Sequence, residues 1–218
     1  MDSAFEENAP LLIISVLWQM ILYIIGKYLS NSNCLGGKRA MENLGSNDIE
    51  NEPQILGKNI SDLSLCYLTC PQDAAGAYMG ALMITDFRAR PIHFSYTSPV
   101  RPTIYQKILF ASTLNPHVKI DVIAQKLLSG VPRIPDVLFV DDIEILPARQ
   151  IIKKPTACLK KRDANPANLS FIDYKTESNE DQERIGQVIA HLENHFDLIE
   201  PFLRMRQAIK EALKTQES

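Results

Sequence analysis

Residues 84–116 read ITDFRARPIHFSYTSPVRPTIYQKILFASTLNP and form the middle of the stretch 63–142, which decides the fold. Within this longer stretch, three runs have the composition of strands: 63–70, 78–85 and 92–98. In the third run Ile92, Phe94 and Tyr96 alternate with polar side chains, a period of two that indicates one buried and one wet face. The sequence therefore predicts an antiparallel β-meander.

Helix signals follow the third run. Pro102 suits the first turn of a helix, because its missing amide proton would be unpaired there in any case. Asn115 and Pro116 form a second start signal, an N-cap followed by proline. Residues 136–142 (DVLFVDD) are an apolar run with charged ends, typical of a strand covered on both faces. Because a helical crossover allows this strand to run parallel to the third, we predict an α/β fold with a mixed (α+β) sheet.

The flanking parts of the chain differ in composition from this core. We predict an apolar N-terminal helix over 1–29, a linker over 30–56, the α/β core domain over 57–176 and a C-terminal helical pair over 177–218. The linker is rich in Asn, Gly and Ser, with few large apolar side chains to offset the entropy of ordering.

The C-terminal pair has a clear apolar stripe. Residues 179–200 predict one amphipathic helix, and Pro201 starts another. The apolar positions at helical spacing are Ile185, Val188, Ile189, Leu192, Phe196 and Ile199. Such a stripe packs on the core domain or provides a seam for self-association.

The apolar N-terminal segment begins at Leu11 and ends at Gly26, 16 residues against the roughly 20 that span a bilayer comfortably. Acidic residues precede it where a secretory signal has basic ones, so we do not expect a secretory signal. Lys27 follows it, so a spanning helix would leave the rest of the chain in the cytoplasm, tethered to the inner face of the membrane. Two alternatives stay open: a helix buried against the body or a partner, and a segment outside the working protein, which would then start at Met41.

The overall composition is that of an ordinary soluble protein, with 22% charged residues and a formal net charge of -3, and it does not suggest nucleic acid as a partner. The cysteines do not have zinc-ligand spacing. Cys66 and Cys70 would lie about 13 Å apart on one strand, too far for a disulfide. We expect free thiols in a reducing compartment.

The central stretch resembles a known group of sequences. GALMITDFRARPIHFSYTSPVRPTIYQKILFASTLNPHVKIDVIAQKLL and PDVLFVDD are similar to an uncharacterised bacterial family with a GGLLVTD-type strand, a PxxF-x-YT-x-PVRPT segment, an ILYG-like helix and a PDLVLVDD-like strand. The resemblance covers about residues 63–146, and PVRPT at 99–103 is its most specific piece. Phe110, Ala111 and His117 depart from the Tyr, Gly and Tyr of the family. The resemblance implies domain boundaries and no activity.

A second comparison concerns the order of elements. Antiparallel strands, a helical crossover and a parallel strand are also how ribonuclease H-like nucleases begin, with carboxylates on the first and fourth strands that hold two metal ions. Asp141 and Asp142 fit the fourth-strand position as metal ligands. The first strand, LSLCYLTC, has no carboxylate, and Asp73 and Asp86 lie in turns. A metal-dependent nuclease is therefore one interpretation of Asp141 and Asp142. The other is that these two aspartates only form the polar end of a strand.

Cations around the third strand suggest an anion site. Arg88, Arg90, Arg101 and Lys107 lie near aromatic residues in the sequence. Arg101 precedes a helix start whose free amides attract anions, so we predict an anion-binding or partner-docking surface at Arg90, Arg101 and Thr103. A small-anion-sensing regulatory domain is a further alternative. The simplest alternative is that these cations are solvated and bind nothing.

His191 and His195 lie one helical turn apart, but the sequence shows no third metal ligand beside them. There is also no glycine-rich phosphate loop and no nucleophile elbow. We therefore expect no catalytic residues and no cofactor. The predicted function is a non-catalytic interaction or scaffold module in a larger complex. Its partner would be a protein or a second copy through the helical segments, or a membrane, with nucleic acid not expected.

Overall fold

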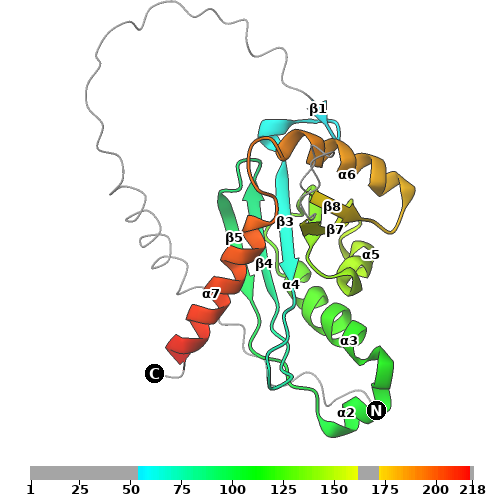
Figure 1. The fold of residues 1–218 in the computed structure, drawn as a ribbon, viewed down its shortest axis with the longest axis vertical. Helices are drawn as coiled ribbons and strands as arrows, with labels where there is room; N and C mark the ends of the chain where they lie inside the picture. Colours follow the sequence, from blue (N-terminus) through cyan, green and yellow to red (C-terminus); the bar gives the residue numbers. More distant parts are fainter. Residues whose placement is uncertain (1–53, 162–171, 217–218) are drawn as a thin grey trace, which may run out of the picture. The chain divides into compact units, whose positions relative to one another are not determined.

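The computed structural model describes residues 54–161 and 172–216, and in these ranges its main sheet has six strands in the order β5-β4-β3-β6-β7-β8 (Figure 1). The strands are β3 (Ser64–Thr69), β4 (Ala81–Asp86), β5 (Pro91–Tyr96), β6 (Val137–Val140), β7 (Thr156–Lys161) and β8 (Ile172–Lys175). Neighbours among β3, β4 and β5 are antiparallel, β3, β6 and β7 are parallel, and β8 is antiparallel to β7. The predicted mixed sheet, with a meander, a crossover and a parallel strand, is confirmed.

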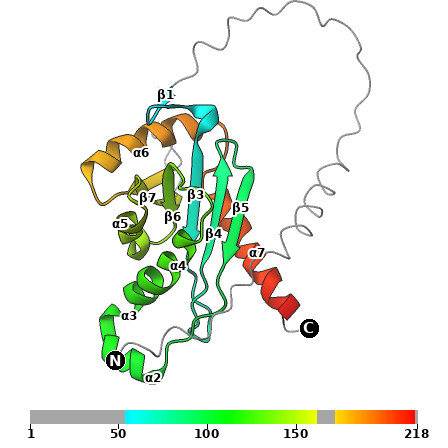
Figure 2. The ribbon, with the colours of Figure 1, turned by 180° about the vertical axis from the view of Figure 1, so that it is seen from behind.

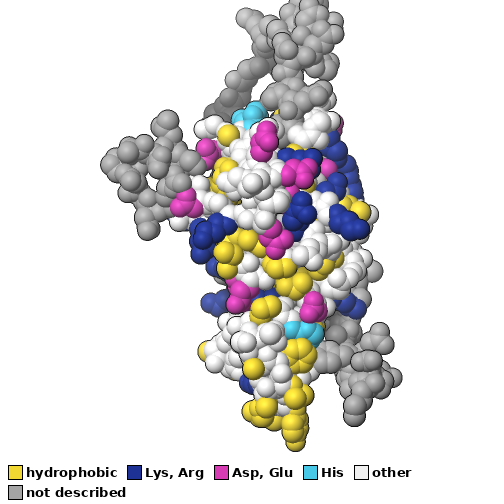
Figure 3. All heavy atoms as spheres, turned by 90° about the vertical axis from the view of Figure 1, so that its right-hand side faces the viewer, with side chains coloured by type: hydrophobic (Ala, Val, Ile, Leu, Met, Phe, Trp, Pro, Cys, Tyr) yellow, Lys and Arg dark blue, Asp and Glu magenta, His cyan; other side chains and the backbone are white. Residues whose placement is uncertain are grey.

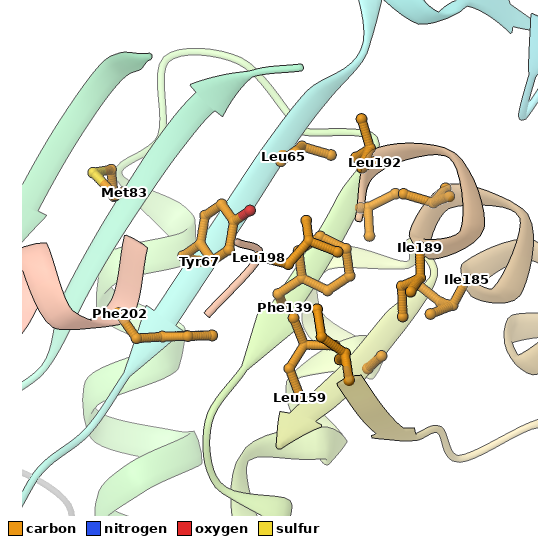
Figure 4. Close-up of a cluster of buried hydrophobic side chains, with 14 of the residues drawn as sticks. Leu65, Tyr67, Met83, Phe139, Leu159, Ile185, Ile189, Leu192, Leu198 and Phe202 are labelled. Atoms are coloured by element: carbon orange, nitrogen blue, oxygen red, sulfur yellow. The ribbon is translucent and has the colours of Figure 1, made fainter. Parts of the chain in front are cut away.

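The central strand β3 is apolar on both faces because each face is covered. Leu65 and Tyr67 belong to one core cluster, Cys66 and Leu68 to the other, and all four are fully buried. The first cluster includes side chains of the C-terminal helices (Figure 4). The second includes side chains of the crossover helices, which lie beside the sheet in Figure 2. Two covered faces explain the continuous apolar runs, since each alternate position meets a core.

The crossover is made of consecutive helical elements: α2 (Ile104–Phe110), η2 (Ala111–Thr113), α3 (Leu114–Pro116), the π-helix η3 (His117–Ala124) and α4 (Gln125–Ser129). Close packing against the sheet is visible at Gly80, just before β4. A Cβ at Gly80 would lie 2.1 Å from Cγ2 of Ile123 and 2.9 Å from Cδ1 of Leu127. The missing side chain therefore lets η3 and α4 approach the backbone.

Helix α2 is exposed although most of its residues are apolar. Thr103 caps it: its hydroxyl accepts a hydrogen bond from the Gln106 amide, and the Gln106 side chain accepts one from the Thr103 amide. None of its residues is buried. The exposed side chains are Ile104, Tyr105, Ile108 and Leu109. Figure 3 shows hydrophobic side chains gathered at this end of the molecule.

The C-terminal helices are α6 (Asn179–Leu192) and α7 (Glu200–Gln216). The predicted helix over 179–200 is too long: α6 ends at Leu192, and the Asp197 side chain accepts a hydrogen bond from the Ile199 amide in the turn that follows. Both helices bury their apolar stripes on the sheet of their own chain. The buried side chains are Ile185, Val188, Ile189, Leu192, Phe202, Met205 and Ile209. Of the two expected roles of the apolar stripe, self-association and packing on the core domain, the structure shows the packing.

The remaining elements are the hairpin β1 (Gln54–Ile55) and β2 (Lys58–Asn59), the short helix η1 (Ile60–Asp62), and η4 (Ile143–Ala148) with α5 (Arg149–Ile152) after β6. The predicted N-terminal helix over 1–29 and nearly all of the linker lie outside the described residues. Across 54–161 and 172–216, no helix has the length and hydrophobicity needed to cross a membrane. Cys66, Cys70 and Cys158 are buried free thiols, as expected.

Candidate functional site

The carboxyl ends of the parallel strands β3 and β6 meet at one edge of the sheet, where Thr69 and Asp141 lie side by side. Oδ2 of Asp141 accepts a hydrogen bond from the Thr69 hydroxyl at 2.6 Å and one from Nη2 of Arg206 at 2.6 Å. The Asp141 side chain is only 12% exposed. Because Arg206 belongs to α7, the C-terminal helix supplies the counterion for this strand end.

Asp142 has a separate partner from the crossover. Nζ of Lys119, on η3, lies 2.5 Å from Oδ2 of Asp142 and 2.7 Å from Oε2 of Glu144. Oδ1 of Asp142 also accepts a hydrogen bond from the Glu144 amide, so Asp142 caps the first turn of η4. The Lys119 side chain is 10% exposed, whereas the two carboxylates are about one third exposed or slightly more, at 35% and 39%. A nearly buried ammonium therefore lies under two half-buried acids.

These contacts set the protonation of the pair. Desolvation acts to raise the pKa of Asp142, but the hydrogen bonds, led by that from Lys119, outweigh it and lower the pKa from 3.8. Desolvation acts to lower the pKa of Lys119, and the bonds to Asp142 and Glu144 outweigh it and raise the pKa from 10.5. Both groups therefore remain charged through the neutral pH range.

The residues at this edge do not fit a two-metal nuclease site. The predicted ligands Asp141 and Asp142 do lie at the end of β6, next to β3. Yet β3 contributes the Thr69 hydroxyl in place of a carboxylate, and both aspartates are bonded to cationic side chains. Over the described residues, no group of three or more His, Cys, Asp or Glu side chains is arranged to hold a metal ion.

The carboxylates of the other acids considered as ligands accept hydrogen bonds within turns. Asp73 Oδ1 accepts a hydrogen bond from the Ala77 amide in the β3–β4 turn. Asp86 lies at the opposite edge of the sheet from Asp141, since its register partner is Ser64 at the start of β3. Its carboxylate accepts bonds from the backbone and the guanidinium of Arg90. Neither acid completes a site with Asp141.

The predicted anion-binding residues are not brought together as one site. Arg90 precedes β5 and Arg101 follows it, so they lie at opposite edges of the sheet, beyond the two ends of a strand about 17 Å long. Arg90 is paired with Asp86 at 2.6 Å. Thr103 uses its hydroxyl and its amide in the capping box of α2. Arg101 is exposed at the carboxyl edge, and an anion site there stays a prediction.

Further cations lie at the same edge as Arg101. Because β5 and β7 run in the same direction as β3, the α2 start that follows β5 and the end of β7 share the carboxyl edge. The exposed cations here are Arg101, Lys107, Lys160 and Lys161. None of their side chains has a hydrogen bond or ion pair with another described residue. Tyr105 is 75% exposed between Arg101 and Lys107. The Phe110 ring is stacked on His117 at a centroid distance of 4.3 Å.

His191, near the end of α6, and His195, just after this helix, lie near each other, with ring centroids 5.4 Å apart. They lie at the end of the helix, and no group of three ligands forms there in the part of the chain that the structure describes. This pair therefore does not define a metal centre on its own.

Sequence reasoning missed Lys119, Glu144, Thr69 and Arg206 as members of the site. Lys119 lies 23 residues before Asp142, and Arg206 lies 65 residues after Asp141. No local pattern links residues at such separations. One usable signal was present: Lys119 interrupts the apolar face formed by Val118, Ile123 and Ala124. A lysine on such a face is expected to have a buried partner.

No protein-family model and no curated protein matches the chain. Among solved structures, endonuclease V from Bacillus subtilis is similar with 12% identity and a TM-score of 0.32, over 47% of this chain and 46% of that one. Endonuclease V (D234N) from Ciona intestinalis, in complex with a 23mer DNA containing an inosine followed by a ribo-adenosine, has 12% identity and a TM-score of 0.30. That match covers 57% of this chain and 53% of the other, so this chain spans about half of each structure.

These findings correct the predicted function and partners. The prediction of a non-catalytic interaction module, with nucleic acid not expected, is wrong: the similar structures are nucleases, and one of them holds DNA. The physical reason lies in the C-terminal helices, whose apolar stripes were the main argument for a protein partner and are buried within the domain. TM-scores of this size do not assign an activity to this chain.

Proposed function

We propose that this protein binds nucleic acid along the carboxyl edge of its sheet, as a domain whose elements follow the order of ribonuclease H-like nucleases. The observation that carries the proposal is a group of exposed cations at this edge whose side chains have no ion pair with another described residue, in a chain with a formal net charge of -3: Arg101, Lys107, Lys160 and Lys161. Lys and Arg neutralise backbone phosphates and release their counterions, which is the main source of sequence-independent binding. A group of unpaired cations at one edge of an acidic protein therefore indicates a polyanionic partner.

The geometry of the edge suits a strand of phosphates. Arg101 and Lys107 lie beyond β5, and Lys160 and Lys161 end β7. Four strand spacings of about 4.8 Å separate β5 from β7, which gives about 19 Å of edge. At 3.4 Å per phosphate this length corresponds to about six nucleotides.

Tyr105 adds a surface for bases between two of these cations. Its ring is 75% exposed, and its neighbours Arg101 and Lys107 have no acidic partner among the described residues. Single-stranded nucleic acid is held by such combinations of cations and exposed aromatic rings, because every base has a face that stacks. We therefore expect single strands to bind more tightly than duplexes.

Fluorescence anisotropy with a labelled single-stranded oligonucleotide of mixed sequence tests the proposal. Arg101→Gln combined with Lys107→Gln removes two positive charges from the carboxyl edge. A matched control combines Lys126→Gln and Arg133→Gln, which removes the same charge from exposed residues on and after α4. The first pair is expected to weaken binding at least about tenfold, and the control pair less than about threefold.

Three outcomes would overturn the placement or the function. Equal losses of affinity in the two double variants would mean that binding depends on the total charge and not on its position. A larger loss of affinity in the control pair would move the surface to α4 and the segment that follows it. Cleavage of the oligonucleotide in Mg²⁺ that Asp141→Asn abolishes would replace binding by catalysis, the metal-dependent reading of the same strand ends.

A further inference from the structure

Lys119 holds the position between two carboxylates that a metal ion would need. Its Nζ lies 2.5 Å from Oδ2 of Asp142 and 2.7 Å from Oε2 of Glu144, so both acids converge on one nitrogen atom. Mg²⁺ in proteins is commonly held by one or two carboxylates with waters in the remaining positions. The ammonium therefore neutralises, from inside the protein, the acids that could otherwise share a divalent cation.

Arg206 does the same for the neighbouring acid. Its Nη2 lies 2.6 Å from Oδ2 of Asp141, the same oxygen that accepts the Thr69 hydroxyl bond. Two-metal catalysis needs carboxylates whose lone pairs are available to the ions. At this edge the cations come from η3 and α7, elements far apart in the sequence, and each is directed at a different acid just after β6.

We infer that Lys119 and Arg206 are built-in counterions that occupy the place of divalent cations, so that the carboxyl edge works without a metal. This inference concerns what neutralises Asp141, Asp142 and Glu144, and it stands whether or not the protein binds nucleic acid. It also implies a latent metal site. Removing the Lys119 ammonium leaves two carboxylates facing each other, and like charges that close favour capture of a cation.

The test measures Mn²⁺ binding by the loss of its free-ion electron paramagnetic resonance signal. Lys119→Met keeps the length and the apolar stem of the side chain and removes its charge. This variant is expected to bind one Mn²⁺ at least about tenfold more tightly than the unmodified protein. Adding Asp142→Asn to it should abolish the gain, because one of the two carboxylates is then neutral.

Two controls separate a specific site from a change in overall charge. Lys126→Met removes one positive charge from an exposed residue of α4 and should leave Mn²⁺ binding unchanged. Lys119→Arg keeps the charge at the site and should also show no gain. Thermal denaturation in a chelator checks that each variant folds, and Mn²⁺ should raise the Tm of Lys119→Met alone.

Two results would overturn the inference. One is Mn²⁺ binding by the unmodified protein that Asp142→Asn removes, since the acids would then hold a metal with the lysine in place. The other is a folded Lys119→Met that binds no more Mn²⁺ than Lys126→Met. If Lys119→Met does not fold, Lys119→Gln poses the same question, because its amide can still donate hydrogen bonds to the two carboxylates while the positive charge is removed.

Discussion

Substitution of Asp181 tests whether the C-terminal helices are part of the folded domain. Asp181 lies in the first turn of α6, and its side chain is 0% exposed. Its carboxylate accepts hydrogen bonds from Nε and Nη2 of Arg149 at 2.5 and 3.0 Å, and from the Thr156 amide at 3.3 Å. It therefore joins α6 to both α5 and β7. Asp181→Asn keeps the shape of the side chain and removes its charge.

The size of the effect follows from burial. Removing one partner of a buried ion pair costs about 3–5 kcal/mol, because the other charge is left without compensation. The Arg149 side chain is 31% exposed, so water recovers part of this cost and we expect the lower end, about 3 kcal/mol. For a domain of this size each kcal/mol lowers the Tm by about 2–4 °C. Asp181→Asn should therefore lower it by about 6–12 °C.

Urea denaturation followed by circular dichroism measures the loss in the free energy of unfolding. An unchanged slope of this free energy against urea concentration indicates that the native fold is kept. Glu180→Gln is the matched control. Its partner Arg184 lies one turn away, and both side chains are at least half exposed, so its loss should change the free energy of unfolding by less than about 0.5 kcal/mol. A loss below about 1 kcal/mol in Asp181→Asn would refute the reasoning that α6 is anchored to the sheet by this pair.

Three further predictions concern stability. The Tyr67 hydroxyl is buried without a hydrogen-bond partner in the described structure, so Tyr67→Phe should raise the free energy of unfolding by about 1 kcal/mol in urea. Gly80→Ala should lower it by about 1–3 kcal/mol, because the added Cβ would lie 2.1 Å from Cγ2 of Ile123. Desolvation acts to raise the pKa of Asp136, but hydrogen bonds, led by that from Lys58, lower it from 3.8. Its stabilisation is present above the unfolded pKa and lost as pH falls through the folded one, so Asp136→Asn should flatten the acid limb of a stability profile.

Much of the fold could be predicted from the sequence because local patterns determine it. The alternation from Ile92 to Tyr96 and the apolar run before Asp141 predicted the meander and the parallel strand, since the period is a property of consecutive residues. The predicted buried face of β5 is formed only in part, because Ile92 is 63% exposed and Phe94 and Tyr96 are partly buried. The length of α6 was misjudged because Phe196 and Ile199 continue its helical spacing across a turn. There both side chains are partly buried against the core, so the pattern reported packing, not helix.

The site was less accessible to sequence reasoning. Asp141 and Asp142 were found because they end a strand, a local feature. Lys119 and Arg206, which neutralise them, come from elements whose approach depends on how the helices pack across the two faces of the sheet. Arg90 and Arg101 were grouped because they are close in the sequence. The extended strand β5 lies between them and places them at opposite edges of the sheet.

The central claim, binding of nucleic acid through Arg101, Lys107, Lys160 and Lys161, is tested most directly by the salt dependence of affinity for a single-stranded oligonucleotide. Each phosphate contact contributes about 0.7 to the negative slope of log Kobs against log salt concentration on a single strand. If all these cations contact phosphates, the slope is about -2.8. A slope near zero, or no binding at low salt, would contradict the account.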